Sequence, residues 1–260
     1  MKGKILIIAG SDSGGGAGVQ GDIKTVTALG GYAATAITAL TAQNTLGVFG
    51  IHEIPDDFIA RQIELVLSDI GADAIKTGML HRSGVIKTVA ESLEKFERIP
   101  LIIDPVMVAK GGAALLEPEA VEHLKNLLIP RAFLVTPNIP EAEILAGMKI
   151  SDVAAMVAAA EKILELGPKN VLVKGGHLDS EKIYNILARR DGVKVFTKRR
   201  RESRNTHGTG CALASAIATL TAQKYPLAKA VKKALDYVDA AIKDAPNIGK
   251  GHGPLNHMVR

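Results

Sequence analysis

The sequence contains no tryptophan and one cysteine, and aromatic residues make up 3% of its 260 residues. A single cysteine excludes an internal disulfide and fits a reducing compartment, so we expect a cytoplasmic protein. No apolar run reaches the roughly eighteen residues that a membrane span needs, so we expect no membrane contact. The apolar run at residues 5–10 is too short for a signal peptide and indicates a buried strand.

The chain is basic, with a formal net charge of +5 and a pI near 9.2. A basic surface suits either nucleic acid or phosphorylated small substrates. The densest basic run is Lys198-Arg199-Arg200-Arg201, followed by Arg204, and no aromatic residue lies among them to stack on bases. We therefore expect no nucleic-acid partner. The run is typical of a solvated edge, and contact with nucleotide phosphates is a second interpretation.

Apolar strand-like runs alternate with amphipathic helical stretches along the whole chain. The expected strands are 5–9, 35–40, 74–76, 101–103, 133–136, 171–174, 184–188 and 193–197, and the expected helices are 19–28, 57–68, 82–96, 118–128, 139–145, 153–166, 210–223 and 227–243. The dipeptide Asp191-Gly192 predicts a hairpin between the last two strands. Such alternation predicts an α/β fold with a parallel sheet covered on both faces, in one domain spanning 1–260.

Polar or glycine-rich turns follow most of the expected strands. In open α/β sheets, ligands bind beyond the carboxyl ends of the strands, so these turns are candidates for one site. They are Gly10-Ser11-Asp12-Ser13-Gly14-Gly15-Gly16-Ala17-Gly18, Thr77-Gly78-Met79, Asp104-Pro105-Val106-Met107, Pro137-Asn138-Ile139-Pro140-Glu141 and Gly175-Gly176-His177.

The segment 205–211 joins a glycine turn to the start of an apolar helix. Backbone N–H groups at such a start lack helical partners, and together with the helix dipole they bind anions. We therefore expect Gly208, Thr209 and Gly210 to form an anion site. Cys211 follows them directly, and the same field would lower its pKa and favour the thiolate. The plain alternative is that Cys211 is a small buried apolar residue.

Charged side chains end two neighbouring strands. Asp104 could hold Mg²⁺ through water, Asn138 and Glu141 could hold further parts of the metal's water shell, and Lys174 could contact phosphate. Each has a structural alternative: Asn138 and Glu141 match a capping box, and Lys174 could form an ion pair at the sheet edge.

The glycine segment 14–18 lacks both the distant acid of a dinucleotide fingerprint and the lysine of a phosphate-binding loop. It does let a ligand approach the backbone closely. Asp12 and Asp22 are candidates for contacts to a small organic substrate, against a turn or cap for Asp12 and a helix-dipole role for Asp22. The amide of Gln43 can pair with a heteroaromatic ring edge.

Together these segments resemble the hydroxymethylpyrimidine/phosphomethylpyrimidine kinases of the ribokinase superfamily. The motifs that carry the resemblance follow in the family's order over essentially the whole chain: Ala9 to Thr25, Thr38 to Thr45, Lys76-Thr77-Gly78-Met79-Leu80, Asp104-Pro105-Val106-Met107, Thr136 to Glu141, Lys174-Gly175-Gly176-His177, Asn205 to Cys211 and Gly251 to His257. One departure is Gly21, where the family usually has alanine. Some members carry a second domain behind the kinase, and we expect none here.

The resemblance implies a ribokinase-like three-layer α/β/α sandwich with a mostly parallel central sheet. It also implies ATP and Mg²⁺, and two phosphorylations: of 4-amino-5-hydroxymethyl-2-methylpyrimidine, then of its monophosphate. By position, the implied catalytic residues are Cys211, Gly208, Thr209, Gly210 and Lys174; the substrate-binding residues are Gly10, Asp22, Gln43, Met79 and Val106; the nucleotide-binding residues are Asn138, Glu141, Lys174 and Thr209; and the metal-binding residues are Asp104 and Glu141. We expect a homodimer.

Two other functions remain open from the sequence. Pyridoxal or pyridoxine kinase is the first, because that substrate is also a heteroaromatic ring with a hydroxymethyl group. The second is a non-catalytic ligand-binding protein on the same fold, although a pure binder has no need of the metal and base positions.

Overall fold

A computed structural model describes residues 1–108, 112, 115–178 and 180–259. In the described residues, nine strands form one sheet in the order β3-β2-β1-β4-β5-β6-β7-β8-β9. The six central strands, β2, β1, β4, β5, β6 and β7, run parallel to one another. At the two edges, β3 pairs antiparallel with β2, β8 with β7, and β9 with β8. Their bounds are β1 Lys4–Asp12, β2 Tyr32–Asn44, β3 Gly47–Glu53, β4 Ala74–Thr77, β5 Leu101–Ile103, β6 Leu134–Val135, β7 Asn170–Lys174, β8 Lys182–Arg189 and β9 Gly192–Arg199.

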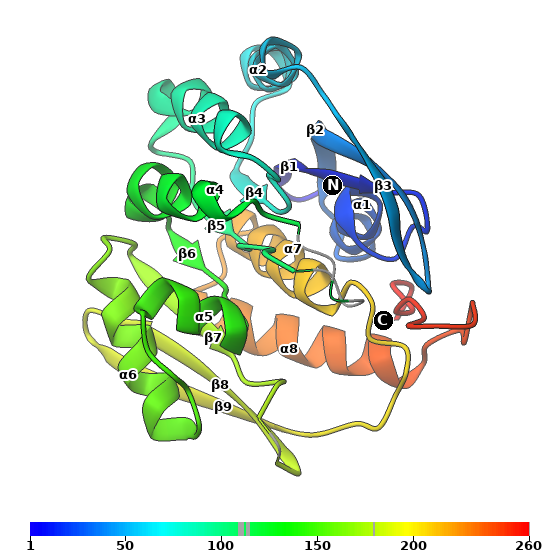
Figure 1. Ribbon diagram of the computed structural model, residues 1–260, viewed down its shortest axis with the longest axis vertical. Helices are drawn as coiled ribbons and strands as arrows, with labels where there is room; N and C mark the ends of the chain where they lie inside the picture. Colours follow the sequence, from blue (N-terminus) through cyan, green and yellow to red (C-terminus); the bar gives the residue numbers. More distant parts are fainter. Residues whose placement is uncertain (109–111, 113–114, 179, 260) are drawn as a thin grey trace.

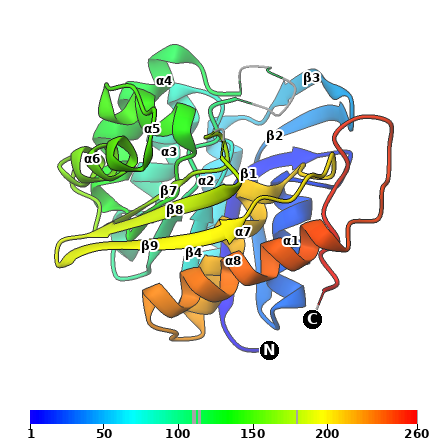
Figure 2. The same cartoon turned by 90° about the horizontal axis from the view of Figure 1, so that it is seen from below.

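Helices cover both faces of this sheet, which gives three layers (Figures 1 and 2). One face carries α1 Gly18–Ala28, α7 Thr209–Ala222 and α8 Leu227–Lys243, and the other carries α2 Asp56–Leu65, α3 Ser83–Ser92, α4 Pro118–His123, α5 Ile139–Ala146 and α6 Val153–Leu164. The predicted three-layer sandwich with a mostly parallel sheet is therefore confirmed.

The alternation of side chains along β1 explains why both faces are covered. Leu6 and Ile8 belong to the core beneath α2 and α3, whereas Ile5 and Ile7 belong to the core beneath α1 and α7. All four are fully buried. A strand that is apolar on both sides needs two helical layers to remove it from water.

The structure differs from the predicted elements mainly at edges and ends. β3, an edge strand with two glycines that pairs antiparallel with β2, is not among the strands expected from the sequence. The predicted helices 57–68 and 118–128 end in π-helical turns, Val66–Ile70 and Leu124–Leu128. The hairpin at Asp191-Gly192 is present between β8 and β9. No helix in the described parts of the chain is long and apolar enough to cross a membrane.

Candidate active site

A cavity of about 700 Å³ opens beyond the carboxyl ends of the parallel strands. Every predicted site residue except Asp22 lines it: Gly10, Gln43, Met79, Val106, Asp104, Asn138, Glu141, Lys174, Gly208, Thr209, Gly210 and Cys211. They come from turns spread over some 200 residues, and the parallel arrangement of the sheet brings those turns to one edge.

The glycine turn before α7 has the geometry of an anion site. Gly208 is the N-cap of α7 and has a φ of +81°, and a Cβ at this position would lie 1.9 Å from the carbonyl oxygen of Gly16. The first helical hydrogen bond runs from the N–H of Ala212 to the Gly208 carbonyl. The N–H groups of Gly210 and Cys211 therefore precede the helical ladder, at the positive end of the helix dipole.

Cys211 lies in the first turn of α7 and lines the cavity. Burial raises the pKa of its thiol to about 12, although Lys76 and the N–H of Gly18 oppose that shift. The prediction of a lowered pKa is therefore wrong for the substrate-free protein, because desolvation of the thiolate outweighs the field of the helix terminus. Cys211 rests as a neutral thiol.

Asp104 and Lys174 form an ion pair across the end of β6, because β6 lies between β5 and β7 in the sheet. The expectation that these two residues end neighbouring strands is therefore wrong. Oδ1 of Asp104 lies 2.7 Å from Nζ of Lys174 and also accepts a 3.2 Å hydrogen bond from Thr136 Oγ1. Burial alone would lower the pKa of Lys174, but the carboxylates of Asp104 and Glu141 outweigh it and raise that pKa. A Cβ on Gly210 would lie 3.2 Å from Nζ of Lys174, so this pair stands directly against the anion turn.

Glu141 fills two roles that the sequence analysis treated as alternatives. It completes the capping box of α5: its Oε2 accepts from the N–H of Asn138, and Oδ1 of Asn138 accepts from the N–H of Glu141. Its carboxylate is also on the cavity wall. Burial raises the pKa of Glu141, and Asp104 adds to that shift while Lys174 opposes it. The carboxylates of Asp104 and Glu141 are both buried and repel each other, so a cation bound between them would stabilise both.

The residues of the described chain do not form a ready-made metal cage. No group of three or more His, Cys, Asp or Glu side chains with metal-binding geometry occurs among them. Mg²⁺ commonly uses one or two protein carboxylates together with water and substrate phosphates. Asp104 and Glu141 fit that pattern, and they fit it only with a phosphate-bearing ligand present.

Asp22 does not reach the cavity. Its side chain is fully buried, with Oδ2 2.7 Å from Nζ of Lys76 and Oδ1 2.7 Å from Oγ of Ser215. The structure therefore does not bring Asp22 to the cavity wall, where the predicted contact with a substrate would be made. Lys76 stands in its place on the cavity wall. Lys76 has no predicted role of its own, although a lysine inside the apolar strand 74–77 is unusual enough to mark it from the sequence.

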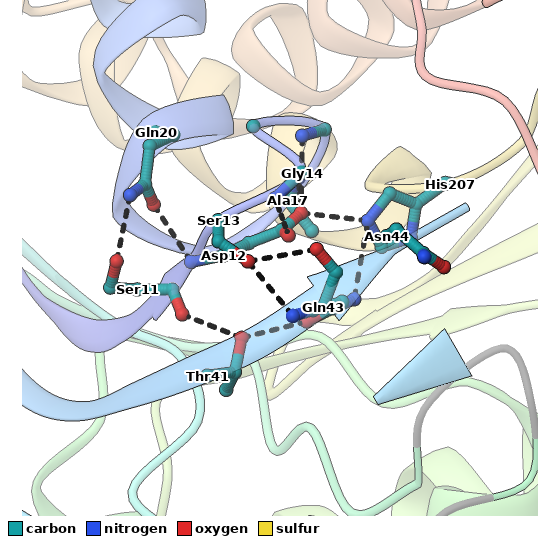
Figure 3. Close-up of polar contacts among 12 residues, drawn as sticks. Ser11, Asp12, Ser13, Gly14, Ala17, Gln20, Thr41, Gln43, Asn44 and His207 are labelled. Carbon is teal, nitrogen blue, oxygen red and sulfur yellow. Dashed lines mark hydrogen bonds and ion pairs between the residues drawn. The ribbon is translucent and has the colours of Figure 1, made fainter. Parts of the chain in front are cut away.

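Asp12 organises the glycine loop after β1 (Figure 3). Its carboxylate accepts hydrogen bonds from the N–H groups of Gly14, Gly16 and Ala17, and from Nε2 of His207 at 2.8 Å. Burial alone would raise the pKa of Asp12, but the hydrogen bonds from His207 and Ala17 outweigh it and lower that pKa. The turn-cap interpretation of Asp12 thus describes its contacts. His207 has no role predicted from the sequence.

The basic run lines the far part of the cavity, and several of its members have structural partners. Arg200 donates to the carbonyl oxygens of Gly176, Leu178 and Ser180. Lys198 pairs with Asp236, and Arg201 makes a two-pronged contact with Asp239. These contacts join the carboxyl end of β9 to α8 and to the loop after β7.

Comparison with known proteins identifies the family. The model of the phosphomethylpyrimidine kinase family matches residues 12–256. The chain belongs to this family. The resemblance stated from the sequence is confirmed, and the chain is a kinase of that family, which removes the non-catalytic alternative.

Two curated proteins and one solved structure show how similar this chain is to known members of the fold. A hydroxymethylpyrimidine/phosphomethylpyrimidine kinase of Bacillus subtilis is 45% identical, over 98% of this chain and 95% of its own length. A thiamine biosynthesis bifunctional protein, ThiED, of Geobacter sulfurreducens is 52% identical, over 99% of this chain, and this chain spans 53% of that longer protein. The structure of a pyridoxal kinase from Staphylococcus aureus in complex with AMP-PCP and pyridoxal superposes with a TM-score of 0.90, at 35% identity over 99% of this chain and 94% of that one.

Proposed function

We propose that this chain uses ATP and Mg²⁺ to phosphorylate the hydroxymethyl group of 4-amino-5-hydroxymethyl-2-methylpyrimidine, and then the resulting monophosphate to the diphosphate. One observation carries the proposal. A single cavity joins a mostly apolar wall that bears one amide, Gln43, to the anion turn 208–211 and the Asp104–Lys174 pair. Phosphoryl transfer from a nucleoside triphosphate to a flat heteroaromatic alcohol requires that the binding sites for these two molecules adjoin.

The ring end of the cavity is formed by Gly10, Gln43, Met79 and Val106. A Cβ on Gly10 would lie 3.3 Å from Cε of Met79, so glycine leaves room beside the methionine for a flat ring. Val106 has a φ of +41°, a strained conformation for a β-branched residue. Such strain is often found where a side chain is held against a ligand. Gln43 supplies the polar contact that distinguishes one ring from another.

The phosphate end supplies positive charge and N–H donors. The N–H groups of Gly210 and Cys211 bind the equatorial oxygens of the transferred phosphoryl group, and Lys174 donates to the phosphates of the nucleotide. Asn138 and Thr209 complete the nucleotide side. Asp104 and Glu141 would hold Mg²⁺, which neutralises phosphate charge. Because phosphoryl transfer needs positioning and charge neutralisation above all, this arrangement supplies most of what the reaction requires.

In this proposal Cys211 accepts the proton of the hydroxymethyl group as the bond to phosphorus forms. With a pKa of about 12, the thiolate is present in only about one molecule in 10⁵ at pH 7. The base role therefore belongs to that small thiolate fraction, while the N–H groups of the turn act in every molecule. In the second phosphorylation the acceptor is already an anion, so that step needs no base.

Product analysis with ATP and Mg²⁺ tests the proposal. The aminopyrimidine alcohol, its monophosphate and pyridoxal are assayed in parallel, and we expect the largest kcat/KM on the two pyrimidines. Pyridoxal is the second candidate substrate, because the S. aureus pyridoxal kinase shares this fold closely. A larger kcat/KM on pyridoxal would overturn the choice of ring. The homodimer, the single domain over 1–260 and the cytoplasmic location stay predictions.

A further inference from the structure

His207 joins the two ends of the cavity through contacts that the proposed chemistry does not use. Its Nε2 lies 2.8 Å from Oδ2 of Asp12 and 3.4 Å from the terminal amide of Gln43. The residue that follows it is Gly208, the N-cap of the anion turn. Figure 3 shows Asp12 and His207 on one side of the Gln43 amide and Thr41 on the other.

The position of the His207 ring is tightly defined. Its backbone N–H donates to the carbonyl of Gly253, and a Cβ on Gly16 would lie 2.5 Å from the ring carbon Cδ2. The ring therefore packs on the glycine loop, at a position that only glycine allows. Asp12 is almost fully buried and is held by three backbone N–H groups, so the acceptor that His207 meets is equally well placed.

The donors and acceptors around Gln43 determine how its amide is oriented. Nε2 of His207 faces the carboxylate of Asp12, so it carries a hydrogen and donates. That single hydrogen points to Asp12 and can reach Gln43 only as a shared contact at the longer distance of 3.4 Å. An oxygen of Gln43 at this place gains the shared contact, whereas an NH₂ group would set two donors face to face. Figure 3 draws the nitrogen at that place; a half-turn of the amide exchanges the two atoms without moving any other group.

Thr41 leads to the same orientation independently. Its hydroxyl has one hydrogen, and Oγ1 lies 2.9 Å from the carbonyl oxygen of Ser11, which can only accept. Oγ1 also lies 3.0 Å from the Gln43 amide, so toward Gln43 it accepts, and the atom there must be the NH₂. The backbone of Gln43 is clamped by Ser13, whose Oγ donates to the Gln43 carbonyl and accepts from its N–H.

We propose that His207, held by Asp12, is a positioning residue that fixes the Gln43 amide with its oxygen toward the anion turn and its NH₂ toward Thr41, and thereby sets which way round the substrate ring binds. This inference rests on the proposed function. In the aminopyrimidine, the ring nitrogen, the carbon bearing the amino group and the carbon bearing the hydroxymethyl group follow one another. The amino group donates to the Gln43 oxygen and the ring nitrogen accepts from the NH₂.

The consequence is a direction for the hydroxymethyl group. With the amino group on the His207 side, the neighbouring hydroxymethyl carbon also lies on that side, toward 208–211. The opposite amide orientation would turn the ring over and point the hydroxymethyl group away from the phosphate. Pyridoxal has no amino donor beside its ring nitrogen, so it cannot make this paired contact with the Gln43 amide, and its binding should depend much less on the orientation of that amide.

A double-mutant cycle tests the proposal. His207→Phe keeps a flat ring and removes the donor, and Gln43→Ala removes the amide. We expect His207→Phe to lower kcat/KM for the aminopyrimidine alcohol roughly three- to tenfold and to leave kcat/KM for pyridoxal nearly unchanged. In the Gln43→Ala background the same change should have no further effect on the ratio of the two. His123→Phe, on an exposed residue of α4, is the matched control.

Equal losses on both substrates, or effects that multiply in the double variant, would overturn the proposal and leave His207 as a packing residue. A measurement without substrate separates this failure from failure of the proposed function. Long-range ¹H–¹⁵N spectra report which imidazole nitrogen carries hydrogen, with His207→Phe assigning the signal. We expect a protonated Nε2 on His207. A bare Nε2 would overturn the orientation of Gln43 whatever the substrate of the enzyme.

Discussion

The Nζ atom of Lys76 lies 2.7 Å from Oδ2 of Asp22, and neither side chain is exposed to solvent. Ser215 donates to the second oxygen of Asp22, and Lys76 is part of the cavity wall. Burying two charges is costly, and only their attraction and their hydrogen bonds offset that cost. Asp22 thus keeps the Lys76 ammonium on the cavity wall near Cys211. Neither charge would be stable in this buried position without the other.

Asp22→Asn removes the counter-charge of Lys76 and should lower the free energy of unfolding by about 3–5 kcal/mol, because a lone ammonium then stays buried. Urea unfolding followed by circular dichroism measures the change. Glu64→Gln is the matched control, because it breaks an exposed pair with Arg61 of the same 2.7 Å length; there the unfolding midpoint should hardly move. If both variants leave the midpoint unchanged, the buried pair contributes no more than a surface pair.

Cys211→Ala should lower kcat/KM for the alcohol substrate about 10²–10⁴-fold, the usual contribution of a general base. The loss on the monophosphate should be much smaller, since its phosphate oxygen is already an anion. Steady-state assays of the two reactions with one enzyme preparation make this comparison, and the second reaction serves as control for folding. Equal small losses on both would leave Cys211 as a packing residue of the anion turn.

The pH dependence of the two reactions should differ in slope. Because the pKa of Cys211 is raised to about 12, the thiolate fraction rises tenfold per pH unit throughout the neutral range. Log kcat/KM for the alcohol should therefore rise with a slope near one from pH 6 to 9, and the slope should be absent for Cys211→Ala. A flat profile for the native enzyme would exclude thiolate catalysis by the free protein.

Lys174→Met should lower kcat/KM for ATP by about 10²–10³-fold, as the loss of one preorganised donor to a transferred phosphoryl group typically does. The change also leaves the buried Asp104 carboxylate without its partner, so thermal unfolding is measured alongside. Lys194→Met removes an exposed cation on β9 and is the control. Loss of stability with normal kcat/KM for ATP would limit Lys174 to a structural ion pair.

Much of the site could be predicted because the parallel sheet orders it. Once strands and helices alternate, the turns after Ala9, Thr77, Ile103, Val135 and Lys174 must meet at one edge. The edge strand β3 was missed, since its residues are largely exposed and it contains two glycines, so neither burial nor propensity marks it.

Contacts between distant charges were the part that the sequence left open. The sequence made both Asp12 and Asp22 candidates for substrate contacts, yet Asp12 organises the glycine loop with His207 and Asp22 is buried against Lys76. Asp12 and His207 are 195 residues apart. The partner of each carboxylate depends on how α1 and α7 pack against the sheet. The local pattern of apolar and polar residues does not determine that packing.

The sequence by itself determined the layers, the edge at which the site lies and the glycine turn before Cys211, because periodicity and glycine placement act within a few residues. The tertiary structure decided the chemical state of the site. Burial made Cys211 a thiol, since desolvation grows with the number of protein atoms around the sulfur. Hydrogen bonds between turns that are distant in the chain placed His207 between Asp12 and Gln43, because the partners of a side chain depend on how these turns pack together and not on the sequence next to it.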